Sequence, residues 1–196
     1  MNNRLTWGGQ VTAISNKVIS LVQRLNRYRE ELPFGVRKIL VQSLVLPAFD
    51  YGFIVYHDLA VTLAVRLQRL QNSAVRFIFK VPRDVHITPY YARLEWMRLD
   101  RRRDVTALLT LHKILKFQTP QYLYDRFTYQ SSVHGLSTRQ INFLSIPKHR
   151  TTIMNKSYSV AACRLWNALP QDLRQTELSV GTFRSGLMSW FRVQNC

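Results

Sequence analysis

Hydrophobic side chains at helical spacing predict the elements of the N-terminal third of the chain. In residues 11–28, apolar positions recur every three or four residues and fall on one arc about 120° wide, which is typical of an amphipathic helix. Pro33 suits the first turn of a second helix that runs to Leu44, and Pro47 is expected to kink or end it. Residues 48–56 are apolar and aromatic, and their pattern fits either a helix or a buried strand.

A third helix, predicted over residues 59–79, combines an apolar face with a row of cations. At roughly 100° per residue its apolar positions share one side, and four basic residues form a stripe about 80° wide beside them. These four, called the basic stripe below, are Arg66, Arg69, Arg76 and Lys80. We therefore expect this helix to pack through one face and to present positive charge along its flank.

Helix start signals continue through the rest of the chain. Threonine followed by proline at positions 88–89 and 119–120 is typical of a cap and a first helical position. Asp100 is placed to cap another helix, and two more are predicted over residues 157–168 and 179–193.

Residues 129–156 differ, because they are rich in Ser, Thr, Gln and His and show no helical stripe. We expect a long loop with at most a small β-hairpin, built from strands near 140–146 and 151–155. A stretch of this length either orders on a partner or packs against sequence absent from the chain. The predicted fold is therefore mainly α, with a helical bundle over 1–128, an irregular basic linker or small hairpin over 129–156, and a C-terminal helical segment over 157–196.

Composition adds a strong positive charge. The chain has 28 Lys and Arg against 11 Asp and Glu, for a net charge of +17, and its 46% hydrophobic content excludes a disordered basic tail. Arg outnumbers Lys by 21 to 7, and Arg grips phosphate in a planar fork. A field of this sign attracts DNA, RNA or an anionic membrane. No run reaches 18 apolar residues, so we expect no membrane partner.

Cysteine usage and the N-terminus bear on the compartment. Cys163 and Cys196 belong to no CxxC pair, and no secretory signal is visible. We expect a reduced intracellular setting, nuclear or cytoplasmic, with a disulfide between the two cysteines as the alternative.

Candidate catalytic groups are scarce. Among eleven carboxylates only Asp100 and Asp104 lie one helical turn apart, and a helix cap with a first-turn acid explains them better than a two-metal site. No histidine pair has zinc-site spacing, and glycine-rich phosphate loops and GxSxG elbows are absent from the sequence. We expect no catalysis by this chain alone, and no cofactor or metal.

The remaining candidate chemistry is basic. The densest cluster comprises Arg93, Arg98, Arg101, Arg102 and Arg103. Consecutive arginines on a helix point in different directions, so the last three cannot all serve one flat surface; a solvated helix start is the alternative. A second cluster, whose alternative is a solvated loop, comprises Lys148, His149 and Arg150. Aromatic residues that either stack on bases or belong to the core are Tyr90, Tyr91, Trp96 and Trp166.

Several segments occur in an order that carries a family resemblance. They begin with Arg-Leu-Thr-Trp at position 4, and they are Leu-Pro-Ala-Phe-Asp-Tyr at 46, Leu-Gln-Arg-Leu-Gln-Asn at 67, His-Ile-Thr-Pro-Tyr at 86, Leu-Glu-Trp-Met-Arg-Leu at 94, Pro-Gln-Tyr-Leu at 120, Pro-Lys-His-Arg-Thr at 147 and Leu-Trp-Asn-Ala-Leu-Pro at 165. This ordered set resembles the C-terminal part of non-LTR (LINE) retrotransposon reverse transcriptases, the jockey-like group in particular.

The resemblance implies a helical thumb-like domain and a post-thumb region that help hold template RNA and primer DNA. The implied partner is nucleic acid, as RNA, DNA or an RNA–DNA duplex, together with the family's palm domain. The chain departs from the family in lacking a Tyr/Phe-x-Asp-Asp motif, so polymerase activity is not implied. Two alternatives are a structural or protein-interaction fragment that packs on the missing palm, and a decayed retroelement copy without selected function.

Overall fold

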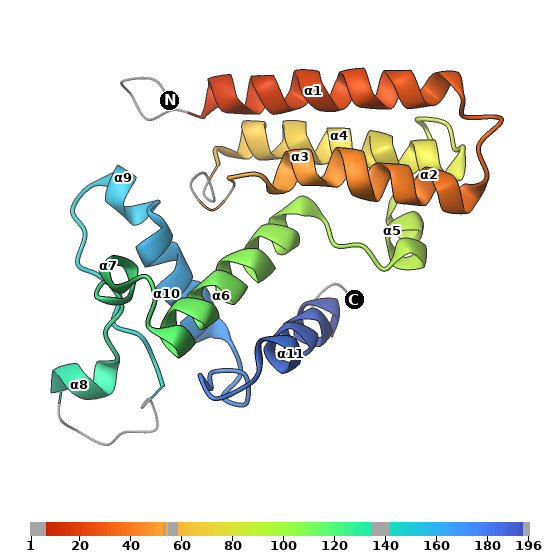
Figure 1. Cartoon of the computed structure of the whole chain (residues 1–196). Helices are drawn as coiled ribbons and strands as arrows, with labels where there is room; N and C mark the ends of the chain where they lie inside the picture. Colours follow the sequence, from red (N-terminus) through yellow and green to blue (C-terminus); the bar gives the residue numbers. More distant parts are fainter. Residues whose placement is uncertain (1–6, 53, 55–58, 135–141, 194–196) are drawn as a thin grey trace. The chain divides into compact units, whose positions relative to one another are not determined.

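The computed structural model describes residues 7–52, 54, 59–134 and 142–193 (Figure 1). Every named element in these ranges is a helix, which confirms the mainly α prediction. The β structure found in the same ranges is one isolated antiparallel bridge between Tyr129 and Leu144.

The chain divides into two compact units, Met1–Arg102 and Arg103–Cys196. The division lies inside a helix, α6 (Leu99–Phe117), and not at the irregular stretch where the pattern placed the boundary between 128 and 129. A continuous helix carries no turn or loop signal, so hydrophobic periodicity cannot reveal a change of packing partner along it.

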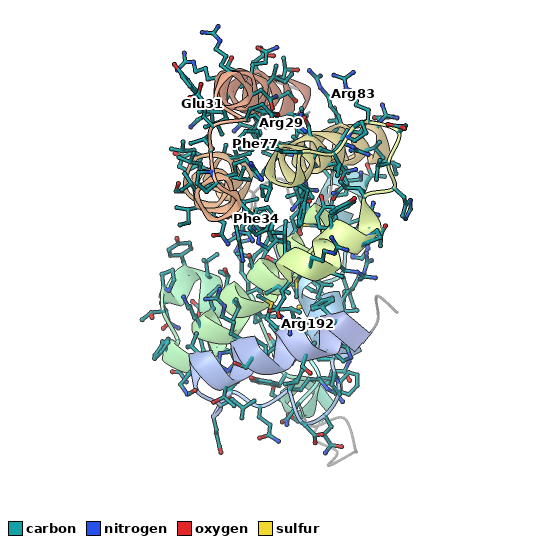
Figure 2. The ribbon with its side chains drawn as sticks, turned by 90° about the vertical axis from the view of Figure 1, so that its right-hand side faces the viewer. Arg29, Glu31, Phe34, Phe77, Arg83 and Arg192 are labelled. Carbon is teal, nitrogen blue, oxygen red and sulfur yellow. The ribbon has the colours of Figure 1, made fainter. Side chains whose placement is uncertain are left out.

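In the first unit, α1 (Gly8–Arg27) packs along α4 (Val61–Phe79) and against a second helical rod. That rod consists of α2 (Phe34–Leu40), the π-helical turn η1 (Val41–Val45) and α3 (Leu46–Asp50). The large buried side chains at the centre of the first unit are Phe49, Leu67, Phe77 and Ile78. Figure 2 shows Phe77 between the helices of this unit.

Pro47 explains the π-helical turn in the middle of the second rod. A proline has no N–H to donate to the preceding turn, and a π-helical turn is one way a helix accommodates the loss. The chain then stays helical to Asp50 and turns at Gly52, whose φ is +66°. Residues 48–50 are therefore helical, which decides between helix and strand for the start of the aromatic stretch.

A buried polar network joins α4 to the segment that follows it. The Gln68 side chain donates to Tyr91 on α5 (Thr88–Leu94) at 2.9 Å and accepts from the Leu99 backbone N–H at 2.9 Å. Gln71 donates to the Met97 carbonyl at 3.0 Å. Burial raises the pKa of the Tyr91 hydroxyl, which stays a neutral hydrogen-bonding group. These bonds fix the start of α6 against the middle of α4.

The second unit surrounds a separate aromatic core. Its further helices are α7 (Gln121–Tyr124), α8 (Gln130–His134), α9 (Thr152–Asn155), α10 (Tyr158–Ala168) and α11 (Val180–Val193). His112 on α6 stacks on Phe183 on α11, with ring centroids 4.1 Å apart, and the Trp166 ring lies 6.5 Å away. All three side chains are fully buried.

The expected strand pair in residues 129–156 is wrong where the structure describes it. Thr152–Asn155 is a helix, because Thr151 accepts a capping bond from the Met154 N–H at 3.2 Å. Residues 140 and 141 lie outside the described residues, and the rest of the first expected strand holds only the bridge at Leu144. The Asn167 side chain accepts from the Leu144 N–H and donates to the Leu144 carbonyl, both at 2.8 Å. It thereby satisfies the two backbone groups that a neighbouring strand would otherwise pair.

Candidate nucleic-acid interface

The basic stripe on and just after α4 separates into exposed and engaged cations. Arg66 and Arg69 are exposed, and Arg66 makes one long contact of 3.4 Å to the Thr12 hydroxyl on α1. Lys80 instead pairs with Glu30, at 2.8 Å to Oε2, and lowers the pKa of that carboxyl. The first two side chains remain available to a ligand.

Arg76, the fourth member of the stripe, organises the loop after α4. Its Nε donates to the Pro82 carbonyl at 3.2 Å, and its Nη2 donates to the carbonyls of Arg83 and Val85 at 3.2 and 3.1 Å. The guanidinium is therefore partly used as an internal clamp, and it holds Arg83 in position.

A groove of about 650 Å³ runs between α1 and α4 beside these residues. Its lining is mainly apolar on the α1 side and carries cations on the α4 side. The lining residues are Val18, Ile19, Val22, Gln23, Asn26, Arg69, Leu70, Asn72, Ser73, Arg76 and Arg83. Arg83 is exposed and lies at the outer edge of the unit (Figure 2). Pattern analysis missed it, because it stands alone in a loop.

Exposed cations also lie on α1, at positions that do not line the groove. Lys17, Arg24 and Arg27 are exposed and lie off the apolar arc, as their helical positions predict. We call the residues that line the groove, together with Arg66 about one turn before Arg69, the groove face.

The arginine cluster that begins at Arg93 does not form one surface. Arg93 and Arg98 are exposed, and the Arg93 guanidinium lies 5.6 Å from the centroid of the Tyr90 ring. Arg102 makes a bidentate pair with Asp50, with Nε to Oδ1 at 2.7 Å and Nη2 to Oδ2 at 2.6 Å. That carboxylate raises the pKa of the guanidinium.

The two neighbours of Arg102 also differ from the expected phosphate-binding cluster. Arg103 is only 8% exposed, so its placement on a phosphate-binding surface is wrong. It lies one turn before the buried Ala107, which puts it at the edge of the packing face of α6. Arg101 is half-buried. The three consecutive side chains thus lie in different environments, as helical geometry predicts.

The second basic cluster lies in the second unit. Lys148 and Arg150 are exposed. His149 is half-buried, and its Nδ1 lies 3.0 Å from the Pro147 carbonyl oxygen, a contact in which the ring N–H donates. The two exposed cations remain candidates for phosphate contact, and the histidine has a local structural partner.

The four candidate stacking aromatics belong to the cores. Tyr91 and Trp166 are buried, and the Trp166 indole donates to the Asn142 carbonyl at 2.9 Å. Tyr90 and Trp96 are half-buried and pack on the core of the first unit. The core interpretation of Tyr91 and Trp166 is confirmed, and neither offers a face to a nucleobase.

The ionisable groups of the described residues show no built metal site. No group of three or more His, Cys, Asp or Glu in the described part of the chain is arranged to hold a metal ion. Cys163 is a free, buried thiol whose pKa is raised by burial, and Cys196 lies outside the described residues. Among the helices that the structure describes, none is long and apolar enough to cross a membrane.

Comparison of the chain with protein-family models, with curated proteins and with solved structures finds no match.

Proposed function

We propose that this chain is a nucleic-acid-binding fragment derived from the C-terminal part of a LINE-type RNA-directed DNA polymerase. It contacts phosphates without sequence specificity, and it has no catalysis of its own. The observation that carries the proposal is the groove face, where exposed Arg69 and Arg83 line an open groove between two helices and exposed Arg66 lies about one turn before Arg69 on α4.

The charges of this face are suited to phosphate because few acids compete for them. Arg66 and Arg69 have no carboxylate within ion-pair distance among the described residues. A well-packed helix fixes the backbone from which each guanidinium extends, so binding a phosphate has to order only the side chain. Binding through such contacts releases counterions and weakens steeply as salt rises.

The test is a salt series of binding isotherms. Fluorescence anisotropy with single-stranded RNA, single-stranded DNA and an RNA–DNA duplex measures the slope of log affinity against log salt. Replacing Arg66, Arg69 and Arg83 by Ser together is expected to reduce the magnitude of that slope by about 2 to 3, because each lost contact removes roughly 0.7 to 0.9.

A matched control removes the same number of positive charges from a different surface. Lys113, Arg126 and Arg184 are exposed residues of the second unit, and their triple Ser variant also removes three charges. This control is expected to change the slope by less than half as much. An equal effect of both triple variants, or a wild-type affinity that salt does not change, contradicts the proposal.

A second candidate function rests on a different surface. On α2 the apolar residues Val36 and Ile39, three positions apart and therefore on one side of the helix, are 40% and 63% exposed. Such a surface favours a protein-interaction fragment that packs on another domain, the family's palm in this proposal. Light scattering at moderate salt separates the two cases: concentration-dependent self-association that Ile39→Lys abolishes supports the apolar surface, and a monomer at all concentrations counts against it.

A further inference from the structure

The second unit contains a pocket that the groove face does not explain. Its volume is about 470 Å³, and its lining is mainly polar. The lining residues are Tyr129, Ser131, Asn142, Arg174, Gln175, Thr176 and Glu177.

Arg174 is the central feature of this pocket. The Cζ atom of its guanidinium lies 3.9 Å from the centroid of the Phe143 ring, so one face of the cation is covered by an aromatic ring. Its Nε and Nη1 are buried, and neither has a hydrogen-bond partner among the described residues. Burial lowers the pKa of the guanidinium, which remains charged. A buried donor without a partner is costly, and each such exception needs an explanation. Nη2 is not one of these buried atoms, so it is the nitrogen that a ligand in the pocket can reach.

The charge balance around the guanidinium favours an anion. No carboxylate in the described part of the chain lies within ion-pair distance of Arg174, although Glu177 lines the same pocket. The Glu177 segment is itself held by a cation, because Lys116 Nζ donates to the carbonyls of Glu177 and Leu178 at 3.0 and 2.8 Å. The Arg174 guanidinium therefore has no carboxylate partner in the described part of the chain.

The scaffold that presents Arg174 is fixed by hydrogen bonds. Phe143 lies in a segment pinned on both sides, since its carbonyl accepts from the Gln130 N–H at 2.8 Å and the neighbouring Leu144 is bonded to Asn167. The Asn142 carbonyl accepts from the Trp166 indole at 2.9 Å. The backbone of Arg174 closes a turn on the Gln171 carbonyl at 3.1 Å. The backbone that carries the guanidinium and the ring below it is thus held in place before any ligand binds, and the ring contact orients the guanidinium.

We propose that this pocket binds a single phosphate group. Arg174 is the anchor, Nη2 is the nitrogen that meets the anion directly, and the Asn142 amide supplies a further donor. A tetrahedral anion with several oxygens uses a fork of donors of this kind better than a chloride ion does. Glu177 opposes the ligand and limits its affinity.

The experiment titrates the full-length chain with inorganic phosphate at constant ionic strength, with sodium chloride as the balancing salt. The readouts are calorimetry and the ¹H–¹⁵N resonance of the Arg174 Nε–H group, which is assigned by its loss in Arg174→Lys. The wild type is expected to show one saturable site and a shift of that resonance. Arg174→Lys keeps the charge and loses the fork, and it is expected to bind at least about tenfold more weakly.

The matched control is Arg184→Lys, at an exposed position of α11 in the same unit, which is expected to bind as the wild type does. A non-saturable response that is equal in all three proteins means that phosphate only screens the +17 surface, and it overturns the proposal.

A second variant guards against loss of folding in Arg174→Lys. Glu177→Gln keeps every donor and removes the opposing charge, so it is expected to tighten phosphate binding roughly threefold to fivefold. An unchanged affinity in Glu177→Gln overturns the assignment of the pocket.

Two phosphate probes then distinguish the source of the ligand. Dimethyl phosphate imitates a nucleic-acid backbone, and inorganic phosphate imitates a free or terminal phosphate. Competition by dimethyl phosphate assigns the pocket to a backbone phosphodiester. Binding of inorganic phosphate alone assigns it to a free or terminal phosphate, and binding of neither overturns the proposal.

Discussion

Acidification is predicted to destabilise the second unit through His112. This ring is fully buried and stacks on Phe183, and burial lowers its pKa below the ordinary value. A backbone contact with Gln175 opposes this lowering of the pKa, and the Lys116 ammonium adds a smaller lowering. The folded unit therefore holds His112 neutral, and the unfolded chain takes up a proton at this position near pH 6.5.

The sign and size of the effect follow from proton linkage. Because the unfolded state binds more protons, stability is complete above the unfolded pKa and falls as the pH drops below it, until the folded pKa is reached. The loss is at most about 1.4 kcal/mol for each pH unit in this window. Between about pH 7.5 and about pH 5.5, His112 alone therefore accounts for up to about 1.4 kcal/mol.

The assay is urea unfolding at both pH values, followed by tryptophan fluorescence, since Trp166 lies beside His112 in the same core. His112→Phe keeps an aromatic ring against Phe183 and cannot titrate, so it is expected to lose this part of the pH dependence. His86→Gln, at an exposed histidine of the first unit, is the control and is expected to retain it. A wild-type pH dependence that persists unchanged in His112→Phe refutes the reasoning.

Three further substitutions test other contacts, each by urea unfolding at neutral pH. Arg37→Met is expected to cost about 2 to 4 kcal/mol, because the buried guanidinium donates to the carbonyls of Ile78 at 2.8 Å and Leu32 at 2.6 Å, and these acceptors would lose their partner; a cost below about 1 kcal/mol contradicts this role. Gly186→Ala is expected to cost about 1 kcal/mol, the low end for overpacking, since a Cβ at this position on α11 meets the flexible end of the Leu173 side chain, whereas the control Gly181→Ala has room and should cost nothing. Asp50→Asn is expected to cost only about 1 kcal/mol or less, because the pair with Arg102 is more than one third exposed, and a larger loss would show that screening is overestimated.

Periodicity predicts α1 and α4 well because each helix buries one continuous face and exposes the other. The same reasoning fails for charged residues that lie on the buried face. Arg37 precedes the buried Val41 and Val45 by one and two turns, so its position alone puts it on the packing side of its helix, although its charge suggests the surface. Hydrophobicity scales assign such a residue to the surface, since they do not count the backbone carbonyls that can satisfy a buried cation.

The candidate interface is predictable only in part, for a related reason. Helical spacing correctly leaves Arg66 and Arg69 on an open flank, because their surroundings depend on local geometry alone. The partners of Arg76 and Arg102 come from a loop and from a distant helix end, and no local pattern encodes such tertiary contacts. The pocket at Arg174 has the same character, since Phe143 and Arg174 are 31 positions apart.

The excess of cations over acids itself shapes the fold. With 28 Lys and Arg against 11 Asp and Glu, most cations cannot find a carboxylate, and several bond main-chain carbonyls in place of one. Arg37, Arg76 and Lys116 each donate to two or more carbonyl oxygens, and each joins a helix to a connecting segment. Cations used in this way are structural and are poorly placed to release counterions on binding. The salt dependence of nucleic-acid binding should therefore follow the exposed cations of the groove face and not the net charge of +17.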